Sequence, residues 1–61
     1  MEQISYPKEY FSEGFYTKTG SVIVDSLTLY CENQNVSKQE VIDHALREFF
    51  EKRGIIVPLP Q

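Results

Sequence analysis

Side chains that usually carry out chemistry are few in this chain, and they do not form a catalytic set. Cys31 is the one cysteine and His44 the one histidine, so the ligand clusters of a zinc site are missing. The sequence also lacks a nucleophile with a nearby base, a functional pair of carboxylates and a glycine-rich phosphate loop. We therefore expect no catalytic residue, no metal and no cofactor, and we interpret Cys31 as a small core residue.

The segment best suited to contact a partner lies between residues 11 and 19. Aromatic and β-branched residues dominate it, which predicts a strand. Phe15 indicates which side of the strand faces a core, so Gly14, Tyr16 and Lys18 face outward. A lone strand is not stable, and the sequence offers no second one. We therefore expect this strand to pair antiparallel with the same strand of a second copy, about a two-fold axis.

A helix with both ends specified is predicted between Val36 and Gly54. Ser37 is a good N-cap, and Glu40, three residues later, completes a capping box. Gly54 can adopt the left-handed conformation that ends a helix. The apolar residues of this helix recur at helical spacing and form one wide stripe that needs cover; they are Val41, Ile42, Ala45, Leu46, Phe49 and Phe50.

A second helical pattern covers Ser21 to Asn33, with Thr19 or Ser21 as its expected N-cap. Its first apolar residues are β-branched and would also suit a strand, but the stripe continues in phase along the segment, which favours a helix. The stripe consists of Ile23, Val24, Leu27, Tyr30 and Cys31. Asn35 tolerates the left-handed conformation, so it is the expected turn residue between the two helices.

Both ends of the chain are predicted to lie outside this helical part. Residues 1–10 mix charges with Tyr6 and Tyr10, and we interpret them as a loosely packed arm. Residues 55–61 are apolar and interrupted by prolines, so this tail either packs against the body or binds a partner. On the second helix, Asp43 and His44 are expected to face solvent together with the other acidic residues.

Length and composition indicate a small domain that needs a partner. The chain has 61 residues, a size that is marginal for folding alone, and one cysteine cannot form an intrachain disulfide. Oligomerisation is the remaining way to stabilise it. No apolar run reaches membrane-spanning length and no signal-peptide pattern begins the chain, so we expect a soluble cytoplasmic protein. The net charge of −3 argues against nonspecific nucleic-acid binding and is compatible with sequence-specific binding.

The order of strand, helix, tight turn and capped helix resembles the ribbon-helix-helix family of DNA-binding proteins, of the Arc, MetJ and CopG type. The resemblance spans residues 14–53. It is strongest over residues 35–50, where a turn residue, valine, serine and two polar residues precede a helix that continues with alanine, leucine, arginine, glutamate and an aromatic residue. It implies a mostly α, β-α-α fold over residues 11–54, in an intertwined homodimer. The paired strands then form an intermolecular two-stranded antiparallel ribbon that enters the major groove.

Family roles carried over residue by residue give three expected sets. The set that contacts DNA bases is Gly14, Tyr16 and Lys18. The set that holds a DNA phosphate at the start of the second helix is Val36, Ser37 and Lys38. The shared dimer core is Phe15, Ile23, Val24, Leu27, Val41, Ile42, Ala45, Leu46, Phe49 and Phe50. The resemblance thus implies a transcriptional regulator, in the role of a repressor, with double-stranded DNA and a second copy as its partners.

The sequence differs from the family pattern at three points. Gly14 has no side chain to contact a base, Gly20 and Ser21 stand where the family often has proline, and Glu9 and Glu13 flank the ribbon with negative charge. Together with the apolar tail, these differences motivate an alternative. The chain would then be a protein-interaction module of the same fold, such as an antitoxin-like protein that binds its partner through the N-terminal arm or through Ile55–Gln61.

Overall fold

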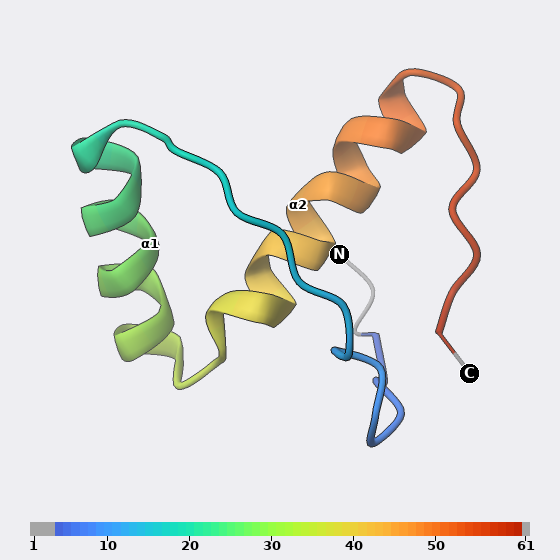
Figure 1. Cartoon of the computed structure of the whole chain (residues 1–61), viewed down its shortest axis with the longest axis horizontal. Helices are drawn as coiled ribbons and strands as arrows, with labels where there is room; N and C mark the ends of the chain where they lie inside the picture. The colour runs from blue at the N-terminus through green and yellow to red at the C-terminus, as the bar shows by residue number, and fades with distance from the viewer. Residues whose placement is uncertain (1–3, 61) are drawn as a thin grey trace.

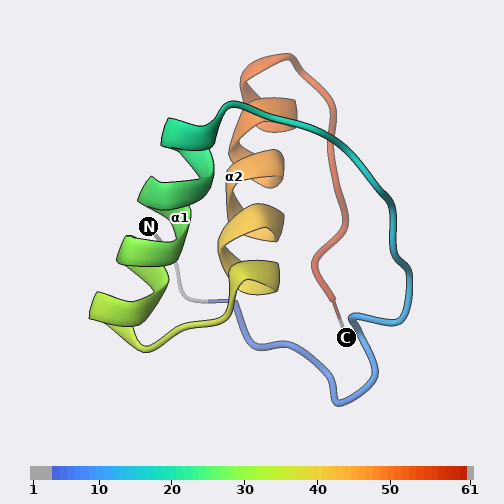
Figure 2. The same ribbon diagram turned by 60° about the vertical axis from the view of Figure 1, so that its left-hand side comes forward.

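Two helices make up the regular structure of this chain. The computed structural model describes residues 4–60, in which α1 spans Ser21–Gln34 and α2 spans Lys38–Lys52 (Figure 1). The helices lie side by side and contact each other, as Figure 2 shows. The prediction of a mostly helical chain with two helices is confirmed. Within residues 4–60, neither helix is long and apolar enough to cross a membrane.

A left-handed residue ends α1, as predicted. Asn35 has φ 54° and ψ 47°, and the N–H groups of Asn35 and Val36 both donate to the carbonyl of Cys31. This arrangement satisfies carbonyl groups that the last turn of a helix leaves without partners. The start of α1 differs from the prediction, because Gly20 occupies the N-cap position and no side chain caps the helix. The expected cap by Thr19 or Ser21 is therefore wrong.

Both predicted ends of α2 are confirmed. The Ser37 hydroxyl accepts a hydrogen bond from the Glu40 N–H at 3.3 Å, which is the expected N-cap. At the other end Gly54 has φ 80°, and the Ile55 N–H donates to the carbonyl of Phe50 at 2.9 Å. Since only a left-handed residue brings the Ile55 N–H back over the helix, Gly54 closes α2 as Asn35 closes α1.

Residues 11–20 form a connection that runs from the N-terminal arm to α1 without pairing to another segment (Figure 1). All side chains of this connection are exposed. The described residues contain no strand, because a strand is defined by hydrogen bonds to a neighbour and a single chain supplies none here. The strand predicted for residues 11–19 therefore stays a prediction that depends on a second chain.

The core of a single chain is very small. Among residues 4–60, Cys31 is the one side chain that is buried, with 7% of its surface exposed, which confirms its prediction as a core residue. Large apolar side chains elsewhere remain in water, including Phe15 at 74% exposed, Ile23 at 60% and Phe49 at 48%. One copy of the chain therefore does not cover its own apolar residues.

Replacing Gly54 with alanine is expected to lower the free energy of unfolding by about 1 kcal/mol, because a Cβ atom is disfavoured at positive φ. No heavy atom lies within 4 Å of the place where that Cβ would sit, so backbone strain alone decides the effect. Gly54→Asn should be milder, since asparagine tolerates the left-handed region as Asn35 does. Chemical denaturation of the three proteins at one concentration measures the difference, and an alanine variant as stable as the wild type would contradict the prediction.

Candidate functional site

α2 has two faces with opposite surroundings. Asp43, His44 and Arg47 are half-buried, whereas Ile42 and Leu46 are exposed. At 3.6 residues per turn these two groups project from opposite sides of the helix. The polar face is covered by both ends of the chain, whereas Ile42 and Leu46 on the apolar face keep 38% and 41% of their surface exposed.

The carboxylate of Asp43 lies at the centre of the covered face. Its Oδ2 atom accepts hydrogen bonds from the Tyr6 hydroxyl at 2.9 Å and from Arg47 Nε at 2.7 Å, and its Oδ1 atom accepts one from the Tyr10 hydroxyl at 2.8 Å. The expectation that Asp43 faces solvent is wrong, because the arm folds back over this side of α2. The arm is also better packed than predicted, with Tyr6 and Tyr10 both half-buried.

Arg47 joins the arm to the C-terminal tail. Its Nη2 atom donates to the Tyr10 hydroxyl at 2.8 Å, and its Nη1 atom donates to the Pro58 carbonyl at 2.7 Å. Arg47 and Asp43 also form an ion pair one helical turn apart. We call Tyr6, Tyr10, Asp43 and Arg47 the clasp, because they hold residues from both ends of the chain against one helix.

Aromatic packing accompanies these hydrogen bonds. The ring of Tyr6 lies 5.1 Å from that of Tyr10 and 4.8 Å from that of Phe11, measured between centroids. The His44 ring meets Tyr6 edge-on at 6.1 Å, so His44 lies half-buried under the arm rather than on the open surface as expected. Aromatic pairs at these separations stabilise one another beyond the area that they bury.

The ionisation of the clasp follows from its hydrogen bonds and burial. Burial, reinforced by the hydrogen bond to Asp43, raises the pKa of Tyr6 to about 12. Burial also tends to raise the pKa of Asp43, but the hydrogen bonds from Arg47, Tyr10 and Tyr6 outweigh it, so that this pKa lies below its ordinary value. The hydrogen bond to Asp43 raises the pKa of Arg47 in turn. Asp43 and Arg47 therefore both stay charged at neutral pH, with a neutral Tyr6 hydroxyl as one of the donors.

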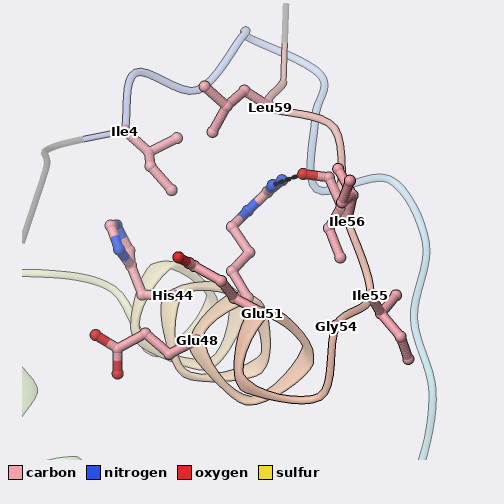
Figure 3. Close-up of a pocket in the computed structure, with 10 residues that line it drawn as sticks. Ile4, His44, Glu48, Glu51, Gly54, Ile55, Ile56 and Leu59 are labelled. Atoms are coloured by element: carbon pink, nitrogen blue, oxygen red, sulfur yellow. Dashed lines mark hydrogen bonds between the residues drawn. The ribbon is translucent and has the colours of Figure 1, made fainter.

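A shallow groove of about 830 Å³ runs between α2 and the tail. Figure 3 shows His44, Glu48 and Glu51 on the helix side, while Ile56 and Leu59 of the tail lie opposite them. Arg47 holds the backbone of the tail beside α2 through the Pro58 carbonyl, whereas the side chains of Ile56 and Leu59 stay exposed, so the predicted alternatives of packing and partner binding both stay open. Among the described residues, no group of three histidine, cysteine, aspartate or glutamate side chains is close enough to hold a metal ion.

The predicted DNA-contacting residues are accessible except for Val36, which is half-buried and whose N–H donates to the Cys31 carbonyl rather than pointing to a free phosphate site. Gly14, Tyr16 and Lys18 lie on the exposed connection before α1, and Tyr16 has 85% of its surface exposed. Ser37 and Lys38 are exposed at the start of α2, where the first N–H groups of any helix lack an internal acceptor. Among the described residues, no hydrogen bond joins the connection to this helix start. Within a single chain, no hydrogen bond therefore links the predicted base-contacting residues to the predicted phosphate-contacting residues.

The predicted dimer core is mostly exposed in one chain. Leu27, Val41 and Phe50 are half-buried. The exposed members are Phe15, Ile23, Val24, Ile42, Ala45, Leu46 and Phe49. On α2 the exposed members form one continuous stripe on the side opposite the clasp. The guanidinium of Arg53 lies 4.4 Å from the centroid of the Phe49 ring and covers part of its face.

The sequence prediction missed the clasp altogether. A signal for part of it was present, because Asp43 and Arg47 are an acidic and a basic residue four positions apart on a helix. The tyrosines carried no comparable signal. Tyr6 lies 37 residues from Asp43 in the sequence, and no local pattern connects residues at that separation.

A tyrosine that titrates near pH 12 is expected from the raised pKa of Tyr6, and the Tyr6→Phe variant should lack this step. Because an unfolded tyrosine has a pKa of about 10, the stabilisation by Tyr6 is complete below pH 10 and is lost as the pH rises towards 12. Tyrosinate absorbance measures the titration. Tyr30→Phe is the control that keeps the late step, and a wild type whose tyrosines all titrate near pH 10 would contradict the prediction.

Comparison of this chain with known protein families, with curated proteins and with solved structures found no match.

Proposed function

We propose that this protein is a homodimeric, ribbon-helix-helix transcriptional regulator that binds operator DNA as a repressor. The observation that carries the proposal is the partly exposed apolar stripe on α2, formed by Ile42, Ala45, Leu46 and Phe49. It coincides with the residues that the sequence pattern assigns to a shared core. It also lies on the side of the helix that the arm and the tail leave free.

A second copy is the natural cover for this stripe. A chain of 61 residues with Cys31 as its one buried side chain between residues 4 and 60 has too small a core to be stable alone. Two-fold symmetry lets the same stripe serve both sides of an interface, so that no other protein is needed. The same symmetry brings residues 11–19 of both copies together, and their unpaired backbone groups then bond to each other.

The proposed ribbon presents its outward residues to the major groove. Lys18 is placed to donate to guanine or to a phosphate, and Tyr16 to contact a base edge or a thymine methyl group. The start of α2 at Ser37 and Lys38 supplies N–H groups and a positive charge for a backbone phosphate. The Ser37 hydroxyl already accepts from Glu40, so the main chain rather than this hydroxyl would contact the phosphate.

Phe49→Ala is expected to weaken the dimer by about 3–5 kcal/mol, because the stripe loses its largest member and a cavity remains at the interface. Sedimentation equilibrium, combined with denaturation at several protein concentrations, measures the change. Val22→Ala is the matched control, since Val22 is exposed on α1 and lies outside the predicted dimer core. A wild type that stays monomeric and folded at high concentration would refute the proposed dimer.

Lys18→Ala is expected to weaken binding to a selected operator by about 1–3 kcal/mol, which is roughly a 5- to 150-fold loss of affinity. The operator is first obtained by selection from random DNA at near-physiological salt. Lys8→Ala serves as the control, because Lys8 is an exposed lysine of the arm outside both predicted DNA sets. Equal operator affinities of Lys18→Ala and the wild type would exclude the ribbon as the surface that contacts the DNA bases.

The tail favours a second candidate function, that of an antitoxin-like protein that binds another protein. Ile56 is 92% exposed although Arg47 holds the backbone of the tail at Pro58. An apolar side chain presented on a fixed backbone suits an apolar groove of a partner. A stoichiometric partner that copurifies with the wild type should be lost from a variant carrying Ile56→Ser and Leu59→Ser. Retention of the partner by that variant would exclude the tail as its binding site.

A further inference from the structure

The clasp has no role in the proposed dimer interface or in the proposed contacts to DNA. It nevertheless contains the densest set of hydrogen bonds among the side chains of residues 4–60. Asp43 accepts from Arg47 and from both tyrosines of the arm, and bonds of this kind to a charged group are stronger than bonds between neutral groups. These hydrogen bonds fix the arm on α2, and the arm leads directly into residues 11–19.

The position of Tyr10 points to that consequence. Tyr10 is the last residue before the segment that is predicted to form the ribbon, and its hydroxyl contacts both Asp43 and Arg47. A tight turn follows directly, in which the Ser12 N–H donates to the carbonyl of Tyr10 at 3.0 Å. The direction in which the chain leaves α2 is therefore set at Tyr10.

The C-terminal end of the segment of residues 11–19 is fixed as well. The carbonyl of Gly20 accepts hydrogen bonds from the N–H groups of Ile23 and Val24, so residue 20 belongs to the first turn of α1. Residues 11–19 thus span two anchors, the clasp at one end and α1 at the other. In a strand, a shift of one residue exchanges the inward and outward sides. Anchors at both ends therefore restrict which residues the ribbon presents.

We propose that Asp43 is a positioning residue, which holds Tyr10 and the arm on α2 and thereby fixes the ribbon segment in the register that presents Tyr16 and Lys18 to DNA. This inference rests on the proposed function. Asp43 touches no DNA in this arrangement and acts through the start of the ribbon.

The test uses the full chain and the variants Tyr10→Phe and Asp43→Asn. Tyr10→Phe removes the hydroxyl and keeps the ring, and Asp43→Asn removes the charge with little change in size. The matched controls are Tyr30→Phe and Asp25→Asn, which make the same changes at exposed positions of α1. Three quantities are measured for each protein: the dimer dissociation constant, hydrogen exchange of residues 11–19, and operator affinity over a range of salt concentrations.

We expect both clasp variants to remain dimers. The amides of residues 11–19 should exchange about tenfold faster, and the operator should bind about tenfold more weakly. A factor of this size is typical of losing one hydrogen bond to a charged group. The dependence of affinity on salt should keep its wild-type slope, since the clasp contacts no phosphate. A merely structural role would change the dimer constant instead. Both controls should match the wild type in all three quantities.

Wild-type exchange and wild-type operator affinity in both clasp variants would overturn the proposal. Loss of the dimer in both variants would also overturn it, because the clasp would then be a general folding element. A wild type that selects no DNA would mean that the proposed function fails. In that case hydrogen exchange alone decides on the clasp: faster exchange confined to residues 11–19 supports the positioning role, and unchanged exchange overturns it.

Discussion

The structure depends on one constraint, which is that α2 needs cover on two opposite sides. One side carries Asp43 and Arg47, whose charges are stable only with hydrogen-bond partners when they are half-buried. The other side carries Leu46 and Phe49, which gain stability only when water is excluded. The two requirements differ in chemistry, so different segments have to meet them.

The ends of the chain meet the polar requirement. Tyrosine hydroxyls from the arm and the Pro58 carbonyl from the tail supply donors and an acceptor that an apolar surface cannot offer. Within one chain the apolar stripe on the other side is covered only in part, because Ile42, Leu46 and Phe49 keep 38%, 41% and 48% of their surface exposed. In the dimer that we propose, a second copy completes the cover on the apolar side of α2.

The backbone of residues 11–20 also lacks a strand partner among the described residues of one chain. The connection between the arm and α1 has N–H and C=O groups with no neighbouring strand, and its side chains are all exposed. In the proposed dimer, two copies pair these segments, and only the pair forms the surface that contacts DNA. In the function we propose, dimerisation therefore stabilises the fold and creates the DNA-contacting surface in the same step. The isolated chain has neither the full stability nor this surface.

The sequence by itself determined the features that depend on neighbours a few residues apart. Ser37 with Glu40, Asn35 and Gly54 specify helix ends through contacts within one turn, so their residue types are sufficient to locate them. The spacing of apolar residues determined which side of α2 carries the stripe. The tertiary structure alone decided what covers the opposite side. Tyr6 and Tyr10 reach Asp43 across 37 and 33 residues, and such contacts depend on how the whole chain reverses direction, which no local pattern records.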